Sequence, residues 1–370
     1  MKIGIAALLI HPKRQGGPET YARRLLEGLQ RVDRRNQYVV FVASGSDFKP
    51  EADNFRVQFV PAPVANPYLR VAWDHTFFSR YLMQHDLDLT HFLGSILPRN
   101  YRRDSVVTIH DTLRFQVPKA SPYLLARYYD WNHDLIRHRE TPVISVSHAD
   151  CAVMAENCQI STDRMYVTPL GVDERFLQLK EADNEKSGIV WIGKNYVHKN
   201  VRTLIEAYAL LNKRRRAPRL RLIGLSDAEV NQVRKWCLES EIPDEQVSLE
   251  GPVQHDEVPG ILRSAELLCF PSIYESFGLP VIEAMASGTA VVCSSLPCFR
   301  ELFGSHVEYC EPTSAQQYAD AMERLLVDKD FRKMREKAGL HHAANFTWDA
   351  CAKKTVEVYE AIGERSTSNG

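Results

Sequence analysis

The sequence predicts an α/β protein made of two doubly wound parallel-sheet domains. Strand-like apolar segments and helix-like amphipathic segments alternate along nearly the whole chain, which is the pattern of parallel sheets joined by crossover helices. The length of 370 residues suits two domains better than one. The polar stretch 179–187 contains no periodic apolar residues, so it predicts the linker between them.

The first domain is expected to span residues 1–178. Short apolar runs rich in Val, Ile and Phe predict its strands, and apolar residues at helical spacing predict its helices. The expected strands are 2–7, 38–42, 57–61, 89–92, 105–110, 142–146 and 165–168. The expected helices are 19–32, 68–85, 123–137 and 149–156.

The second domain is expected to span residues 188–348, and it repeats the same alternation. The expected strands are 188–193, 219–223, 246–250, 267–270 and 290–293. The expected helices are 201–213, 227–237, 257–263 and 279–287. Two such sheets imply two domains that face each other across a cleft.

The composition narrows the class of protein. Hydrophobic residues make up 44% and charged residues 25%, as in globular proteins with a full core. A net charge of −1 gives no overall attraction to nucleic acid, so no nucleic-acid partner is expected. The eight scattered cysteines form no C-x-x-C pair, which favours free thiols in a reducing cytoplasm. No run approaches the roughly 18 apolar residues of a membrane span.

The stretch Pro271–Glu301 carries the strongest functional signal. An apolar run, Leu267–Phe270, predicts a buried parallel strand before it, and a helix pattern follows. Glu275 lies on the connecting loop and Glu283 lies in the helix. Free amides at a helix start favour a phosphate group, and carboxylates accept hydrogen bonds from hydroxyls. Together they describe a site for a sugar nucleotide, although two such residues alone are also typical of a solvated first turn.

The full phrase PS-x-YESFGLPVIEAMASGTAVV resembles the signature of the glycosyl transferases group 1 family, which are retaining enzymes of family 4 with the GT-B fold. The resemblance covers most of the chain and is thinnest over residues 40–100. It implies two Rossmann-like domains, with the nucleotide sugar on the second and the acceptor on the first. It also implies that a last helix, 350–362, packs back on the first domain.

The resemblance assigns roles to the loops of the second domain. Glu275 would contact the donor sugar and stabilise positive charge at its anomeric carbon, and Glu283 would accept hydrogen bonds from the ribose hydroxyls. Lys194, Lys199 and the amides of Phe277–Leu279 would hold the diphosphate. Lys194 stands where the family usually has arginine. Lysine keeps the positive charge but cannot form the paired hydrogen bonds of a guanidinium group. Without the resemblance, two lysines in a loop are most often solvated.

Two further places in the first domain are candidates. His110 lies at the carboxyl end of an expected strand, where open α/β sheets bind ligands. The resemblance implies that it contacts the donor sugar, whereas the residue alone could equally belong to a turn. Gly16 and Gly17 follow the first strand and let the backbone approach a ligand closely. The resemblance places their loop beside the donor diphosphate and the acceptor.

The function that the resemblance implies is retaining glycosyl transfer without metal or cofactor, the nucleotide sugar being a substrate. Mannose transfer from GDP-mannose to a hydroxyl of a glycan or lipid-linked glycan, in bacterial polysaccharide or lipopolysaccharide biosynthesis, is the first expectation. A UDP-sugar donor is the alternative. A sugar-nucleotide epimerase, a phosphorylase and a non-catalytic sugar-nucleotide-binding protein would share the fold.

Two charged patterns remain. Asp86-Leu87-Asp88 forms a D-x-D, which binds metal in another glycosyltransferase fold, but it precedes a short strand here and no metal site is expected. Arginines gather along the first helix and in the loop 99–103. They predict a solvated face, with peripheral contact of a cytoplasmic enzyme with the anionic inner membrane as a second hypothesis.

Overall fold

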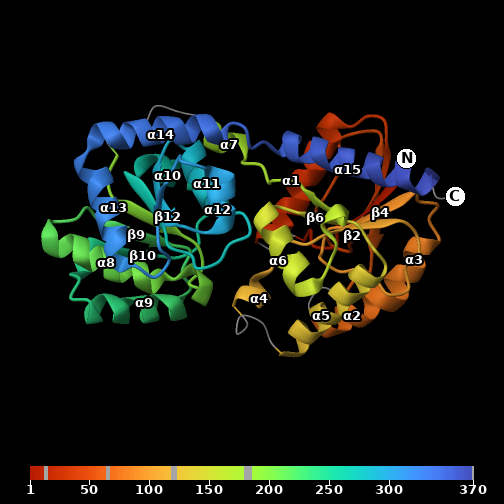
Figure 1. Ribbon diagram of the computed structural model, residues 1–370, viewed down its shortest axis with the longest axis horizontal. Helices are drawn as coiled ribbons and strands as arrows, with labels where there is room; N and C mark the ends of the chain where they lie inside the picture. The colour runs from red at the N-terminus through yellow and green to blue at the C-terminus, as the bar shows by residue number, and fades with distance from the viewer. Residues whose placement is uncertain (12–15, 64–66, 118–122, 179–185, 369–370) are drawn as a thin grey trace. The chain divides into compact units, whose positions relative to one another are not determined.

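The computed structural model describes residues 1–11, 16–63, 67–117, 123–178 and 186–368 (Figure 1). The chain divides into two compact units, one formed by Met1–Gly171 with Trp348–Gly370 and the other by Val172–Thr347. Each unit contains a parallel sheet with helices between most of its successive strands, so the prediction of two doubly wound α/β sheets is confirmed. The boundary falls at Val172, ahead of the expected limit at residue 178, and most of the expected linker 179–187 lies outside the described residues.

Among the described residues of the first unit, seven parallel strands form a sheet in the order β3-β2-β1-β4-β5-β6-β7. The chain moves outward from β1 to β3 and then continues on the other side of β1, so the order reverses between β1 and β4. The strands are β1 (Lys2–Ala6), β2 (Gln37–Ala43), β3 (Phe55–Val60), β4 (Leu89–Phe92), β5 (Ser105–Thr108), β6 (Val143–Ser145) and β7 (Met165–Val167).

The helices of the first unit follow the expected pattern, with one change inside the expected helix 68–85. That segment consists of three successive helical pieces, and the middle piece is a π-helix, a feature that is frequent at functional sites. The helical segments are α1 (Gly17–Val32), α2 (Pro67–Trp73), η1 (Asp74–Phe78), α3 (Ser79–Met83), α4 (Leu113–Gln116), α5 (Tyr123–His138), α6 (His148–Cys158), η3 (Thr162–Arg164) and α15 (Trp348–Ser368).

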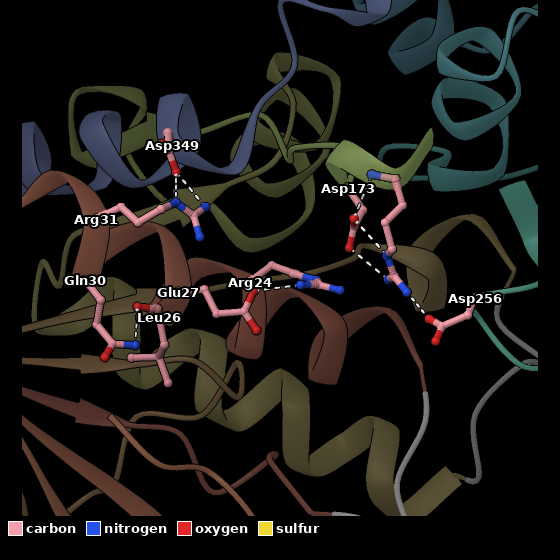
Figure 2. A network of polar contacts seen from close by, with 9 residues as sticks. Arg24, Leu26, Glu27, Gln30, Arg31, Asp173, Asp256 and Asp349 are labelled. Atoms are coloured by element: carbon pink, nitrogen blue, oxygen red, sulfur yellow. Dashed lines mark hydrogen bonds and ion pairs between the residues drawn. The ribbon is translucent and has the colours of Figure 1, made fainter. Parts of the chain in front are cut away.

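The C-terminal helix α15 packs along α1 within the first unit (Figure 1). Gly28 allows the close approach, since a Cβ there would lie 2.7 Å from the carbonyl oxygen of Trp348. At the edge of this contact, Arg31 pairs with Asp349 over 2.6 Å (Figure 2). A helix far along the sequence therefore covers the first helix of the chain.

The second unit contains six parallel strands among its described residues, in the order β10-β9-β8-β11-β12-β13. The strands are β8 (Ile189–Ile192), β9 (Leu220–Ile223), β10 (Val247–Glu250), β11 (Leu267–Phe270), β12 (Ala290–Ser294) and β13 (Glu308–Cys310). The helical segments are α7 (Glu174–Leu177), η4 (Val197–Lys199), α8 (Val201–Arg214), α9 (Asp227–Glu239), η5 (Asp244–Gln246), α10 (Val258–Ser264), α11 (Leu279–Ala286), α12 (Pro297–Phe303), α13 (Ala315–Val327) and α14 (Lys329–Ala343). The sequence patterns did not predict β13 or the helices α12 to α14.

The interiors of both units are apolar. The eight cysteines are buried free thiols, as the scattered spacing predicts. Within the described ranges, no helix is long and apolar enough to cross a membrane. Asp86 and Asp88 make separate contacts, since Asp86 lies 3.6 Å from Arg103 and Asp88 accepts a hydrogen bond from the backbone of Lys2. The described residues contain no group of three or more metal-ligating side chains.

Candidate functional site

The candidate site of the second unit lies where its strand order reverses. β8 and β11 are neighbours in the sheet, and the loops that leave their carboxyl ends diverge, which creates the usual ligand-binding crevice of open α/β sheets. The loop after β8 carries Lys194 and Lys199, and the loop after β11 carries Glu275. The fold therefore brings these three residues to one edge of one sheet.

Lys199 and Glu275 form an ion pair between these two loops. Nζ of Lys199 lies 2.6 Å from Oε1 of Glu275, and the side chains are only 17% and 12% exposed. The hydroxyl of Ser272 donates to the same oxygen over 2.8 Å. The other oxygen, Oε2, accepts no hydrogen bond from the described residues. One oxygen of the carboxylate is thus fixed, and the second stays available to a ligand.

Hydrogen bonds to main-chain carbonyl groups hold the two loops in place. Asn200 has a left-handed conformation with φ 53°, and its side-chain amide donates to the carbonyl groups of Pro271 over 3.1 Å and Pro312 over 2.7 Å. The backbone N–H of Ile273 donates to the carbonyl of His198 over 2.8 Å. The position of Lys199 opposite Glu275 therefore depends on backbone geometry rather than on two flexible side chains alone.

The start of α11 presents free backbone donors. Gly278, the residue before the helix, has φ +90°, and a Cβ there would lie 2.4 Å from the ring of Phe299, so only glycine fits. Pro280 has no N–H to place. The described residues supply no acceptor for the N–H groups of Phe277, Gly278 and Leu279. Three consecutive donors at the positive end of a helix suit an anionic oxygen.

Glu283 lies one turn into α11 and is half-buried. Its carboxylate makes no hydrogen bond or ion pair with the described residues. Burial and the nearby carboxylate of Asp173 raise the pKa of Glu283 to about 8, while Arg175 acts in the opposite direction. Asp173 and Asp256, both labelled in Figure 2, pair with Arg175. Glu283 is consequently a half-buried carboxyl group whose charge depends on what binds beside it.

Lys194 differs from Lys199 in its surroundings. Its side chain is exposed and makes no ion pair with the described residues. The next residue of the loop, Asn195, is held in place because its backbone N–H donates to the carboxylate of Glu229 over 2.8 Å. The charge of Lys199 is therefore compensated by Glu275 in direct contact, while the ammonium group of Lys194 remains open to a ligand.

In the first unit, His110 lies just beyond β5, which ends at Thr108 rather than at the expected residue 110. Its Nε2 donates to the carbonyl of Leu93 over 2.6 Å, and its ring meets the ring of Tyr21 edge-on at 4.9 Å. Burial lowers the pKa of His110 to about 4, so the imidazole is neutral at pH 7. With the proton on Nε2, the remaining nitrogen, Nδ1, is a hydrogen-bond acceptor.

A buried polar network beneath His110 has no signal in the sequence. Thr108 lies 3.1 Å from the hydroxyl of Tyr21 and 2.6 Å from Nε2 of His91. Nδ1 of His91 lies 2.7 Å from the hydroxyl of Tyr359 on α15. Burial lowers the pKa of His91 to about 3, so this network carries no charge at neutral pH. It joins the C-terminal helix to the strands that support His110.

Gly16 and Gly17 lie at the start of α1, where Gly16 has φ 152°. No described heavy atom lies within 4 Å of a Cβ added to either residue, so the space beside them is open. The preceding residue, Gln15, lies outside the described residues.

Comparison with known protein families decides the class of this site. The model described as "Glycosyltransferase Family 4" matches residues 15–176, and the model described as "Glycosyl transferases group 1" matches residues 173–342. The chain is a glycosyltransferase of the group 1 family. The resemblance carried by the phrase around Glu275 is confirmed.

Relatives and solved structures agree with this class. The glycosyltransferase is 27% identical to O-antigen chain mannosyltransferase B of Escherichia coli over 72% of each chain. Its fold matches that of sucrose-phosphate synthase from Thermosynechococcus elongatus with a TM-score of 0.78, 21% identity and 98% coverage of each chain. HepE of Anabaena, solved in complex with UDP-glucose, matches with a TM-score of 0.73 and 17% identity over 98% of this chain and all (100%) of that one. The GT-B fold is confirmed.

The glycosyltransferase also has a cavity of about 300 Å³ in its first unit. It lies at the strand-order reversal, beyond the ends of β1 and β4, and Leu9 and Gly94 are among the residues that line it. The π-helix η1 and the helices α2 and α5 form its walls. Four aromatic rings and seven aliphatic side chains line it, and one ion pair interrupts these apolar surfaces. The cavity therefore combines apolar faces with a small number of polar groups, as ligand pockets do.

That ion pair joins Arg70 to Asp74, whose two carboxylate oxygens both lie 2.9 Å from Nε. Next to it, the backbone N–H of Arg99 donates to Nδ1 of His75 over 2.8 Å, so the ring proton is on Nε2, which lies 2.9 Å from the hydroxyl oxygen of Tyr128. The hydroxyl proton of Tyr128 is then free to be donated, and the described residues supply no acceptor for it. The sequence patterns predicted neither the cavity nor the hydrogen bonds that join Arg99, His75 and Tyr128, because a helical pattern over 68–85 does not reveal a π-helix.

Proposed function

We propose that this glycosyltransferase moves a hexose from a nucleoside-diphosphate sugar to a hydroxyl of a glycan or lipid-linked glycan, with retention of configuration at the anomeric carbon. Mannose from GDP-mannose is the preferred donor. One observation supports the donor site most directly, namely that three kinds of group lie at one sheet edge. They are the carboxylate of Glu275, which has one oxygen fixed, a helix start with three unpaired amides, and the half-buried carboxyl group of Glu283.

In this proposal, the diphosphate binds the amides of Phe277–Leu279 and the ammonium group of Lys194. Those groups stabilise the charge of the leaving nucleoside diphosphate, which is the largest electrostatic demand of the reaction. The donor is held without a divalent metal, so chelation with EDTA is expected to leave turnover unchanged. Glu283 accepts hydrogen bonds from the ribose hydroxyls, and these donors favour its ionised form.

Glu275 acts at the sugar. Lys199 and Ser272 fix its Oε1, while Oε2 faces no described donor, so the carboxylate can stabilise positive charge that develops on the sugar ring. The bond between the anomeric carbon and the phosphate oxygen breaks, and a bond to the acceptor oxygen forms on the same face. The proton of the acceptor hydroxyl passes to the departing phosphate, so the reaction needs no protein nucleophile. His110 orients the sugar through Nδ1.

The acceptor is proposed to bind the cavity of the first unit. Sugar rings have apolar faces that pack on aromatic rings, and their hydroxyls donate and accept hydrogen bonds. Tyr128 offers a donor, Arg70 offers its terminal nitrogens, and Asp74 offers acceptor lone pairs. The paired charges of Arg70 and Asp74 favour a neutral polyol over an anion. A cavity of about 300 Å³ accommodates the terminal sugar of a glycan.

A donor screen tests the proposal. GDP, UDP, GDP-mannose and UDP-glucose are titrated calorimetrically into the full chain. Either the guanosine or the uridine compounds should bind with micromolar affinity, and the others should bind weakly. The E. coli relative, a mannosyltransferase, supports GDP-mannose, whereas the UDP-glucose complex of HepE keeps the UDP sugars as the alternative. Formation of an epimerised sugar nucleotide on incubation without acceptor would overturn the transfer reaction.

A further inference from the structure

A second cavity of the first unit lies at the opposite edge of its sheet from His110. It has a volume of about 410 Å³ and is located beside the amino ends of β5 and β6, where it is lined by Ser105 and Pro142. His110 follows the carboxyl end of β5, so the same strand separates this cavity from the candidate catalytic edge. Nothing in the proposed glycosyl transfer uses it.

The lining of this cavity is strongly basic. Five arginines surround it, against two carboxylates, Asp104 and Glu140. The arginines are Arg102, Arg103, Arg139, Arg164 and Arg365. Glu140 is already paired with Arg164 over 2.8 Å. With both carboxylates counted against the five arginines, the lining still has an excess of three positive charges.

Two of these guanidinium groups are held in place by neutral acceptors. Arg139 donates to the carbonyl of Tyr101 over 2.7 Å and to the carbonyl of Arg99, and Arg103 donates to the carbonyl of His85 over 2.8 Å. Carbonyl oxygens fix the orientation of a guanidinium group without removing its charge. The carboxylate nearest to Arg103 is Asp86 at 3.6 Å, and its full exposure leaves that attraction screened by solvent.

The positive groups also act on one another. Arg102 is exposed and makes no hydrogen bond or ion pair with any residue in the described ranges. Burial and the neighbouring charges of Arg102 and Arg99 lower the pKa of Arg139. Several guanidinium groups of like charge therefore lie around one cavity, and some of them have a fixed orientation. They create a positive electrostatic potential, and a bound anion would reduce the repulsion between them.

We propose that this cavity binds a phosphate-bearing anion, supplied either by an anionic lipid headgroup or by a free phosphate compound. Guanidinium groups match phosphate oxygens with paired hydrogen bonds, and preorganised groups lose less entropy when they bind. The cavity is confined to one unit and to residues outside the donor site. The proposal therefore stands independently of the donor and acceptor assignments.

The test compares the wild-type chain with two charge-reversal variants in the same unit. Arg102→Glu changes an exposed lining residue, so folding should be unaffected, and an unchanged melting temperature checks this. Arg34→Glu makes the same charge change at an exposed position outside the cavity. Pyrophosphate is titrated calorimetrically into each full-length protein at low salt. Separately, each protein is floated with vesicles of phosphatidylcholine alone or with phosphatidylglycerol.

Arg102→Glu should weaken binding of pyrophosphate or of phosphatidylglycerol vesicles at least about tenfold, while Arg34→Glu stays close to wild type. Pyrophosphate bound at the donor edge contributes equally to all three proteins, so their difference reports on the cavity. A loss confined to the vesicles identifies a lipid headgroup, and a loss confined to pyrophosphate identifies a free phosphate compound. Equal binding of both probes by the wild type and both variants would overturn the proposal.

Discussion

The two units share one strand order around the point where it reverses, yet their loops present opposite chemistry. In the second unit, the loops carry an ion pair between Lys199 and Glu275 and unpaired amides at a helix start. In the first unit, the corresponding edge carries a neutral histidine, His110, and a cavity lined mainly by apolar side chains. One is suited to a charged diphosphate and the other to an uncharged polyol.

This difference shows that the fold supplies the place and the loops supply the function. A parallel sheet leaves a crevice wherever its order reverses, whatever the sequence. The donors of the second unit are backbone amides and ammonium groups, which match anionic oxygens. At this edge of the first unit, burial keeps His75, His91 and His110 neutral and Arg70 compensates Asp74, so the edge offers hydrogen bonds without net charge. Substitutions in the donor loops of the second unit and in the cavity of the first unit should therefore affect different substrates.

The largest effect is expected for Glu275→Gln. The substitution keeps the shape of the side chain but removes the charge that compensates Lys199 and that we propose stabilises the sugar in the reaction. We expect kcat to fall roughly 10³-fold with little change in donor affinity. Steady-state kinetics with the donor found by the screen measures both. Glu206→Gln, at a surface ion pair on α8, is the matched control, and a Glu275→Gln enzyme with the same kcat as that control would remove Glu275 from the chemistry.

Gly278→Ala tests whether the helix start in the second unit is built for a ligand. The left-handed φ and the 2.4 Å approach to Phe299 should cost about 2–4 kcal/mol of unfolding free energy and weaken donor binding. Chemical denaturation and donor titration measure the two effects. Gly260→Ala, in α10 with no atom within 4 Å of the added Cβ, should be neutral or stabilising by about 0.5–1 kcal/mol. Equal unfolding free energies for the two variants would contradict the strain argument.

Glu283→Gln separates stability from donor binding. The folded-state pKa of about 8 lies above the ordinary value of 4.5, so unfolding releases a proton between these pH values and stability falls as pH rises through that window. The variant removes this dependence, and it should be more stable than the wild type at pH 8 by about 1–3 kcal/mol. It should also bind the donor about tenfold more weakly. Melting temperatures that show the same pH dependence in both proteins would mean that Glu283 is not the titrating group.

Tyr128→Phe should give the smallest effect, and only on the acceptor. Removing the hydroxyl deletes one hydrogen-bond donor, so KM for a glycan acceptor should rise about five- to tenfold while donor hydrolysis without acceptor is unchanged. Tyr123→Phe, at a position 75% exposed on the same helix, is the control. An unchanged acceptor KM in Tyr128→Phe would mean that the cavity of the first unit does not recognise the acceptor sugar.

Local patterns predicted much of the fold. The strand Leu267–Phe270 begins and ends where the apolar run does, and α11 starts at the expected position. Those features depend on neighbouring residues: a buried strand is a continuous apolar run, and local residues such as Gly278 and Pro280 mark this helix start. The family phrase around Glu275 is local as well, so consecutive residues of the chain were enough to indicate the class of enzyme.

The contacts that give the loops their chemistry join distant positions, and no local pattern contains them. Lys199 meets Glu275 across 76 positions because β8 and β11 are neighbours in the sheet. The proton of His110 is placed by the carbonyl of Leu93, which ends up beside it only after β4 and β5 pair. The amino-acid sequence by itself determined most of the elements, the two-sheet plan and the class of reaction. The packing of the sheets decided which carboxylate oxygen is free, which imidazole nitrogen accepts and where cavities open, because each depends on groups brought together by strand pairing.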